Sequence, residues 1–238
     1  DFTFSGDATV KGTDAGSYDM ELKASDFTND SPNFTNVEFV IVDGTLEIAK
    51  RTVTLTSASD EKVYDGTALT NSDVTVSGDG FANGEGATYD VTGTQTEVGS
   101  SANAFTYTLN AGTKADNYDI TVEFGTLTVT ELTDKVTVTI TENSGSAKYD
   151  GTEKTVTGYV VTSISNGLYT EKDFTFSGNA TIKGTNAGSY PMELKPADFT
   201  NTNTNFANVE FVIVDGTLEI SKRTVILTSA TDSKVYDG

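Results

Sequence analysis

The amino-acid sequence predicts a mainly β protein, an elongated tandem array of β modules of about 86 residues each. Three observations lead to this prediction. Apolar residues alternate with Thr, Ser or acidic residues along most of the chain, Asp-Gly pairs separate the alternating runs, and whole segments recur at a fixed spacing. Alternation with a period of two is typical of strands that bury one face, and no long helical period is present.

The alternating runs indicate where the strands of residues 51–132 should lie. Thr is frequent between the apolar positions because a β-branched hydroxyl side chain suits the exposed face of a pleated sheet. About seven short strands in each module favour an immunoglobulin-like sandwich, and the alternative is a β-grasp-like sheet with a short helix. The residues expected to face inward are Val53, Leu55, Val74, Val76, Phe105, Tyr107, Leu109, Tyr118, Ile120, Val122, Phe124, Leu127 and Val129.

Turns and short helices are expected between these strands. In an Asp-Gly pair, Gly is expected to adopt a positive φ that other residues avoid. One-turn helices are expected at residues 24–28 and at their copy, 196–200, with Phe27 and Phe199 facing inward. The Asp-Gly pairs are Asp43-Gly44, Asp65-Gly66, Asp79-Gly80 and Asp215-Gly216.

The chain repeats itself at two scales. Residues 1–66 align without a gap onto residues 173–238, with 14 substitutions and therefore 66 − 14 = 52 identical positions. A weaker period of half that length is marked by a Tyr-Asp-Gly tripeptide and by an Asn-aromatic pair. The tripeptides begin at Tyr64, Tyr149 and Tyr236, and the pairs are Asn33-Phe34, Asn117-Tyr118 and Asn205-Phe206.

The phase of these markers predicts the domain organisation. Residues 1–50 are the later part of one module, residues 51–132 and 133–222 are complete modules, and residues 223–238 are the opening strands of another. The two complete modules meet at residues 130–133, where no Pro-rich or Gly/Ser-rich spacer occurs. A short junction favours a semi-rigid connection over a flexible one.

Composition excludes several classes of function. The chain has 35 acidic and 15 basic residues, a net charge of −20, and no His, Cys or Trp. Without His and Cys there is no imidazole or thiolate for Ser-His-Asp catalysis, Cys-His catalysis or common zinc and copper sites. The acidic surface disfavours nucleic acid, and no apolar run approaches the roughly 18–20 residues that membrane insertion requires.

The recurring Tyr-Asp-Gly tripeptide is interpreted as a structural turn rather than as a catalytic or binding site. Tyr packs its ring at the edge of the core, Asp caps the turn backbone, and Gly supplies a positive φ. The turn residues are Tyr64, Asp65, Gly66, Tyr149, Asp150, Gly151, Tyr236, Asp237 and Gly238.

Three other chemistries were weighed against plain structural explanations. Paired carboxylates can support glycosidase chemistry, but the acids are scattered and no Trp is available to stack on a sugar, so no enzyme activity, catalytic residue or cofactor is expected. Calcium is the one metal that the composition permits, with Asp60, Glu61 and Asp65 as the candidate cluster, although ordinary solvated acids explain these residues better. Lys11 or Lys183, flanked by apolar residues, could form an isopeptide crosslink if buried, whereas Lys at a strand edge is normally exposed.

Several segments resemble the MBG/YDG-type tandem repeats of large bacterial cell-surface adhesins, such as those of Firmicutes. The resemblance rests on KVYDGT at residues 62–67, on KYDGTEKTVTGY at 148–159, and on the stretch from NYDI to GTLTV at 117–129. It implies an extracellular, cell-wall-anchored, non-enzymatic stalk or adhesin, and it supplies no ligand residues.

Two functions follow as hypotheses. In the first, the modules form a stalk whose partners are its own neighbouring modules, and the acidic surface limits self-association. In the second, each repeat binds a host glycan or protein weakly, and copy number supplies avidity. An exposed aromatic cluster in equivalent places of the modules would favour binding, whereas a surface of Thr, Asn and acids would favour the stalk.

The two ends of the sequence predict head-to-tail self-association through strand addition. Residues 1–50 lack the opening strands of a module, and residues 223–238 supply such strands. Unpaired strand edges recruit other strands. The fit would be imperfect, because an equivalent of residues 155–163 would still be missing. The residues expected to add to another copy are Val225, Leu227, Val235 and Tyr236.

Overall fold

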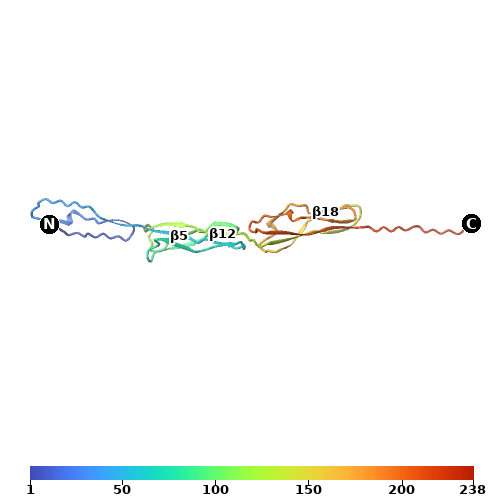
Figure 1. Ribbon diagram of the computed structural model, residues 1–238, viewed down its shortest axis with the longest axis horizontal. Helices are drawn as coiled ribbons and strands as arrows, with labels where there is room; N and C mark the ends of the chain where they lie inside the picture. The colour runs from blue at the N-terminus through green and yellow to red at the C-terminus, as the bar shows by residue number, and fades with distance from the viewer. The chain divides into compact units, whose positions relative to one another are not determined.

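The computed structural model describes residues 1–238 and divides them into two compact units. The first unit contains residues 1–62 and 68–129, and the second contains residues 63–67 and 130–238. Strands dominate both units, and the only helices are single 3₁₀ turns (Figure 1). The predicted module boundaries, which follow the phase of the sequence markers, stay a prediction.

Residues 51–130, most of which lie in the first unit, form two three-stranded sheets and one two-stranded antiparallel sheet. The first sheet has the order β11-β5-β7, the second has the order β6-β12-β9, and β8 pairs with β10. Strands β5 and β12 are labelled in Figure 1. The elements are β5 (Arg51–Ser57), β6 (Asp60–Val63), β7 (Val74–Gly78), β8 (Ala87–Val91), β9 (Gly99–Ala102), β10 (Phe105–Leu109), η2 (Ala115–Asn117), β11 (Tyr118–Glu123) and β12 (Thr126–Thr130).

Strand β5 is the middle strand of its sheet, and its side chains alternate between a buried face and a more exposed face. Val53 and Leu55 are almost completely buried, whereas the intervening Thr residues are partly exposed. The strand pairs in parallel with β11, with Val53 opposite Ile120, and antiparallel with β7. Phe105 and Tyr118 complete this core cluster. Burial of each such side chain stabilises the fold by about 1.5–3 kcal/mol.

In the second unit, residues 136–221 repeat this arrangement. The two three-stranded sheets have the orders β16-β13-β21 and β14-β22-β19, and two antiparallel strand pairs, β15-β18 and β17-β20, accompany them. The elements are β13 (Val136–Glu142), β14 (Gly145–Lys148), β15 (Lys154–Thr157), β16 (Tyr159–Ile164), η3 (Glu171–Asp173), β17 (Phe174–Phe176), β18 (Thr181–Gly184), β19 (Gly188–Pro191), η4 (Pro196–Asp198), β20 (Phe199–Asn201), β21 (Val209–Val214) and β22 (Thr217–Ser221).

Strand β13 has the same role as β5. Val136, Val138 and Ile140 are completely buried, and β13 pairs in parallel with β21 and antiparallel with β16. Aromatic rings cover this strand, including Phe199 and Phe211, whose centroids lie 5.5 Å apart. The mainly β, sandwich-like fold class is therefore confirmed.

Residues 1–50 form only the later strands of such a module. Strands β1 (Phe2–Phe4) and β3 (Phe27–Asn29) pair as β17 and β20 do, and β2 (Gly16–Asp19) pairs with β4 (Thr45–Ile48) as β19 does with β22. The one-turn helix η1 (Ala24–Asp26) corresponds to η4. Residues 37–42 have the same sequence as β21, VEFVIV, yet they form no strand.

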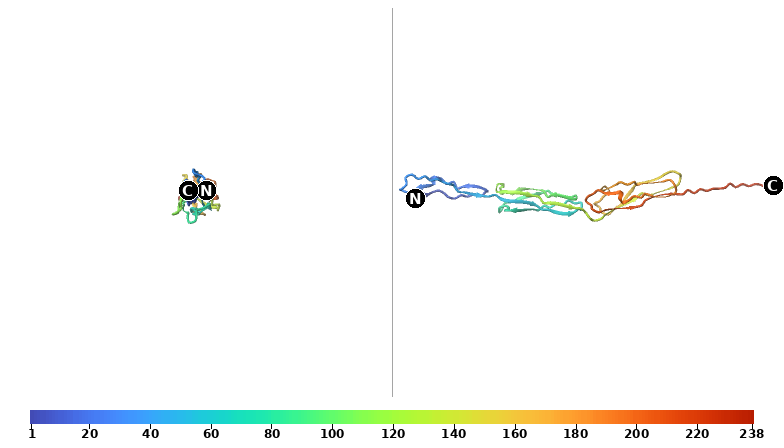
Figure 2. Two further views of the ribbon diagram at one scale, coloured as in Figure 1. Left: turned by 90° about the vertical axis from the view of Figure 1, so that its left-hand side faces the viewer. Right: turned by 45° about the horizontal axis from the view of Figure 1, so that its top comes forward.

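The C-terminal segment is likewise unpaired. Residues 223–238 contain no strand, and Val225 and Leu227 are 73% and 91% exposed, whereas the equivalent Val53 and Leu55 are buried in β5. Figures 1 and 2 draw this segment in red, without a strand beside it. A sequence with strand character thus stays extended and single where no neighbouring strand is present.

Three sequence-based details require correction. Four residues of the alternating runs that are expected to face inward are exposed instead: Val76, Tyr107, Val122 and Phe124. Gly66 and Gly80 have positive φ as predicted, but Gly44 and Gly216 do not. Gly216 is needed for a close backbone approach instead, because an added Cβ would lie 2.5 Å from the carbonyl oxygen of Asn143. The predicted helices at 24–28 and 196–200 are also too long, since each ends at the residue before Phe27 or Phe199, and these residues begin strands.

Candidate functional site

The Tyr-Asp-Gly residues form hydrogen-bonded turns in two of their three copies. The Asp65 carboxylate accepts from the backbone N–H and the hydroxyl of Thr67, at 2.9 and 2.7 Å. Asp150 does the same with Thr152, at 3.0 and 2.7 Å. Gly66 and Gly151 follow with φ of +77° and +83°. This is the geometry of a capped turn, in which Asp bonds the backbone two residues on.

Asp150 has a lysine four residues further along the chain, at Lys154. Lys154 donates to the second oxygen of Asp150 over 2.7 Å, whereas Leu69 stands four residues after Asp65. The hydrogen bond from Lys154, followed by those from Thr152, lowers the pKa of the Asp150 carboxyl. These interactions hold a turn.

The three tyrosines of the tripeptide differ in what covers them. Tyr64 belongs to the second compact unit, where its ring packs edge-on against Phe206 at 5.6 Å. Tyr149 is 39% exposed, and Tyr236, in the unpaired C-terminal segment, is 92% exposed. The same residue is therefore a packing element where an Asn-aromatic corner covers it and a surface residue where none does.

Neither the calcium candidates nor the lysine candidates form a built site. Asp60 accepts from the Glu61 backbone and from Asn71, Asp65 is bonded to its own turn, and no group of three or more acids gathers anywhere in residues 1–238. Lys183 is exposed and lies 3.0 Å from the Glu153 carboxylate, and Lys11 is also exposed. The hypothesis of a buried lysine poised for an isopeptide bond is therefore wrong.

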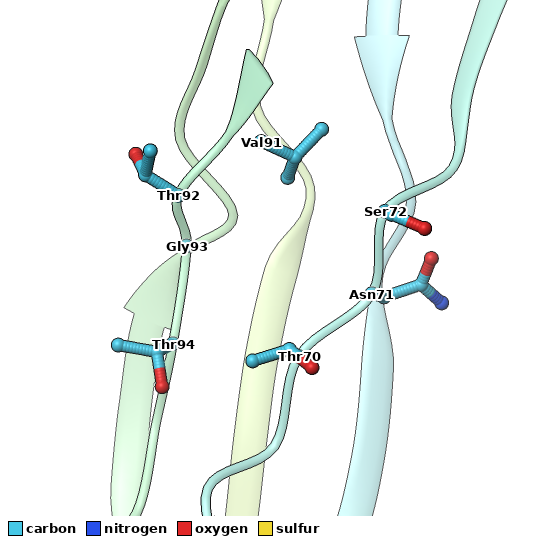
Figure 3. Close-up of a pocket in the computed structure, with 7 residues that line it drawn as sticks. All are labelled: Thr70, Asn71, Ser72, Val91, Thr92, Gly93 and Thr94. Atoms are coloured by element: carbon cyan, nitrogen blue, oxygen red, sulfur yellow. The ribbon is translucent and has the colours of Figure 1, made fainter. Parts of the chain in front are cut away.

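A pocket of about 370 Å³ opens beside β8. Its lining residues stand on two neighbouring segments, 70–72 and 91–94, and they carry hydroxyl, amide and methyl groups without a ring or a charge (Figure 3). The buried Asn103 lies beneath it and donates to the carbonyl oxygens of Ala58 and Asn71, both over 2.9 Å. Its Oδ1 has no hydrogen-bond donor and lies 2.3 Å from where a Cβ on Gly93 would be.

Within the first unit, Asn117 joins the loop at residues 13–15 to helix η2. Its Oδ1 accepts from the backbone N–H of Ala15 over 2.8 Å, and its Nδ2 donates to Asp14 over 3.0 Å. Lys114 also bonds Asp14, over 2.7 Å. The Lys114 hydrogen bond, followed by that of Asn117, lowers the pKa of Asp14, and the bond from Asp14 raises the pKa of Lys114. We call this contact the asparagine clasp.

The clasp was not predicted, although its signal was in the sequence. Asn117 belongs to the Asn-aromatic pair that recurs at the three equivalent places, where it served only as a marker of the repeat. A side chain amide that offers both an acceptor and two donors can bond a backbone N–H and a carboxylate at once. Recurrence of Asn, rather than of any polar residue, is the feature that points to such a bidentate contact.

The aromatic residues build cores rather than a binding platform. In residues 133–222, Phe174, Phe199 and Phe211 are at most 9% exposed. Their equivalents in residues 1–50 form a cluster of the same kind, in which Phe2 is 59% exposed. In residues 133–222 the equivalent rings pack in one core with the residues of β13.

Comparison with known proteins identifies one family. Residues 136–222 match the sequence model of the MBG domain, which agrees with the MBG-type repeat that the sequence resembles. The chain matches none of the curated proteins and none of the solved structures with which it was compared. No helix in the structure has the length and apolar character needed to cross a membrane.

Proposed function

We propose that this chain, whose residues 136–222 form an MBG domain, is a repeat region that serves as a structural stalk in an extracellular bacterial surface protein. The proposal rests on what the recurring residues do in the structure. Tyr64, Phe206 and Asn117 pack or bond onto other parts of the chain, and Phe206, which borders a hollow beside residues 201–204, is itself buried. Residues retained from module to module therefore serve cohesion.

The proposal includes no enzyme activity. Catalysis at neutral pH needs a nucleophile or an acid–base group with a shifted pKa in a cavity. The pKa values of the Asp14, Asp79 and Asp150 carboxyls are lowered, and the largest cause of each shift is a structural hydrogen bond at the surface. The pocket beside β8 contains no titratable side chain.

The proposed location outside the cell rests on the family resemblance and on composition. A net charge of −20 keeps chains soluble and separate at high density, because like-charged surfaces repel each other. No residue of the chain can form a disulfide, so the modules depend on sheet hydrogen bonds and packing. The buried clusters around β5 and β13 supply that packing.

A scattering experiment tests the stalk. We expect the full chain to have a radius of gyration well above the roughly 18 Å of a compact globule of this length, because the modules are joined without a spacer of their own. A value close to the compact figure would contradict a spacing role.

A binding experiment tests the alternative. If each repeat is a weak receptor, immobilised host glycans or matrix proteins should retain the chain. Substituting Thr92→Arg, which fills the pocket beside β8, should then abolish retention. We expect no saturable retention, and retention that Thr92→Arg removes would favour the binding function instead.

A further inference from the structure

Two Asn-Gly pairs occur in the chain, at Asn83-Gly84 and at Asn166-Gly167. A glycine after Asn leaves its backbone nitrogen unshielded, because it has no Cβ. That nitrogen can attack the Cγ of the preceding Asn side chain, which expels ammonia and closes a five-membered cyclic imide. The two pairs are chemically alike, and they differ in how the fold holds them.

Asn83-Gly84 forms the middle of an exposed turn in which both reacting groups are free. The backbone N–H of Glu85 donates to the carbonyl oxygen of Ala82 over 3.0 Å and closes the turn. Neither the Asn83 side chain nor the peptide group between residues 83 and 84 forms a hydrogen bond. Beyond the chain neighbours of Gly84, no atom lies within 4 Å of the place where its Cβ would be. The peptide group can therefore rotate towards the Asn83 side chain without giving up a hydrogen bond.

The Asn166-Gly167 pair is held at the same two points. The Asn166 Oδ1 accepts from the backbone N–H of Leu168 over 2.9 Å. The carbonyl oxygen of Asn166, in the peptide group that would have to rotate, accepts from the backbone N–H of Tyr169 over 3.2 Å. Asn166 is also half-buried, whereas Asn83 is exposed. The fold therefore opposes ring closure at Asn166 and leaves it unopposed at Asn83.

We propose that Asn83 is a site of spontaneous deamidation, and that its isoaspartate product loosens the core of residues 51–132. The backbone nitrogen of Gly84 forms a bond to the Asn83 Cγ, and its proton passes through water to the departing nitrogen. The bond between Cγ and Nδ2 breaks, and that nitrogen leaves as ammonia. Water then adds to one of the two carbonyl carbons of the imide and opens the ring.

The two ways of opening the ring give two products. Opening at the side-chain carbonyl restores the original backbone and leaves aspartate at residue 83. Opening at the main-chain carbonyl leaves isoaspartate, in which the backbone runs through the former side chain and is longer by a methylene group. Both products place a new carboxylate two residues before Glu85, where like charges repel each other.

The turn is tied at both ends to one buried tyrosine, which is why the longer backbone matters. The Tyr118 hydroxyl accepts from the backbone N–H of Ala82 over 3.0 Å and donates to the Glu85 carboxylate over 2.5 Å. The Tyr118 ring packs edge-on against Phe81 at 5.1 Å and belongs to the core cluster around β5. The spacing between residues 82 and 85 is therefore matched to a single hydroxyl group at the edge of this core.

Isoaspartate at residue 83 changes that spacing. The added methylene lies between the two anchors, so Ala82 and Glu85 can no longer both reach the Tyr118 hydroxyl. The buried hydroxyl then loses a partner, and an unpartnered buried polar group destabilises a fold. The modification thus couples an exposed turn to the core of residues 51–132, which weakens as modified chains accumulate.

Mass spectrometry of the full chain, sampled during incubation in neutral buffer, tests the first half of the proposal. Deamidation replaces an amino group with a hydroxyl group, peptide mapping locates the mass change, and an isoaspartyl methyltransferase labels the isoaspartate. We expect the reaction at Asn83 to be faster than at Asn166 by about tenfold, the rate equivalent of roughly 1.4 kcal/mol, because Asn166 must first give up its hydrogen bonds.

Two matched variants and a denatured sample serve as controls. Asn83→Gln, which disfavours closure of the five-membered ring, should abolish the fast reaction, whereas Asn166→Gln should leave it unchanged. In denaturant, where neither pair is held, the two sites of the wild type should react at similar rates. Equal rates at both sites of the folded chain, or a faster reaction at Asn166, would overturn the proposal.

Hydrogen exchange tests the effect on the core. Chains that contain isoaspartate should exchange the Ala82 amide faster than fresh chains do, and Tyr118→Phe, which removes the shared hydroxyl, should set the upper limit. Asn83→Asp adds the charge without lengthening the backbone and should change the exchange rate less. If the Ala82 amide of the isoaspartate chain is as protected as in fresh wild type, the turn does not loosen the core and the second half of the proposal is wrong.

Discussion

The carboxylate of Glu142 accepts the amide hydrogen of Gly216 over 2.7 Å, in a place where the Glu142 side chain is buried. Its other oxygen accepts the amide hydrogen of Leu194 over 2.6 Å. One side chain of β13 thus satisfies two backbone groups on other segments. In the module of residues 51–132, Ser57 stands at the position of Glu142, and its hydroxyl accepts from the backbone N–H of Gly125 over 3.0 Å.

Replacing Glu142 should therefore destabilise the module of residues 133–222. Glu142→Leu leaves two buried amides without an acceptor, and each costs roughly 1–3 kcal/mol, so we expect a loss of about 2–6 kcal/mol in the free energy of unfolding. Calorimetry and hydrogen exchange at the Gly216 and Leu194 amides measure this. Glu142→Gln, which keeps one acceptor oxygen, should lose less. If Glu142→Leu is as stable as the wild type, the buried carboxylate contributes nothing to the fold.

Breaking the asparagine clasp should free the loop at residues 13–15. Asn117→Ala removes the acceptor of the Ala15 amide, so hydrogen exchange at that amide should accelerate. Lys114→Ala removes only an exposed ion pair and should leave the Ala15 exchange rate nearly unchanged. Equal acceleration in the two variants would show that charge, rather than the amide, holds the loop.

Substitution of the turn glycines should affect the second compact unit in both cases. Gly66→Val and Gly151→Val each place a β-branched residue at positive φ, which costs about 1–3 kcal/mol. Gly66→Val should cost more, because its Cβ would also lie 2.9 Å from Leu168, whereas the space around Gly151 is open. The phase of the repeats places Gly66 in the module of residues 51–132, whereas it lies in the second compact unit.

Module-resolved hydrogen exchange separates these outcomes. Loss of protection in β13 and β21 should follow Gly66→Val, with β5 and β11 changed less. The reverse pattern would mean that the turn is coupled to the module of residues 51–132 instead.

The sequence predicted a strand correctly only where the structure also contains a partner strand. Alternation correctly placed β5 and β11. Val53 and Ile120 each belong to a run of apolar residues with a period of two, and they lie opposite each other in one sheet. The hexapeptide VEFVIV occurs twice in the chain. At residues 209–214 it forms β21 beside β13, whereas at residues 37–42 it forms no strand. Strand formation depends on pairing across the sheet, which a local pattern does not contain.

The contacts between segments were less predictable, because one residue type serves several purposes. Asp-Gly at 215–216 is a turn signal, but Gly216 is needed for the close approach of Asn143. Asn117 is a marker of the repeat in the sequence and a bidentate clasp in the structure. The Tyr64 contact with Phe206 joins residues 142 positions apart (206 − 64 = 142) that no spacing rule connects.

The Asp150 turn should respond to acid in a defined direction. The folded-state pKa of Asp150 is lowered below the ordinary 3.8, first by the hydrogen bond from Lys154 and then by those from Thr152. A lowered carboxyl pKa means that the ionised turn stabilises the fold above pH 3.8, and that this contribution is lost as the pH falls through the folded-state pKa.

Carbon-13 NMR of the Asp150 carboxyl should show it ionised at a pH where an ordinary Asp is half protonated. Lys154→Ala should move its midpoint up towards 3.8, whereas Lys148→Ala, which removes a nearby lysine that forms no bond to Asp150, should not. A midpoint at 3.8 in the wild type would mean that the Lys154 contact does not persist in solution.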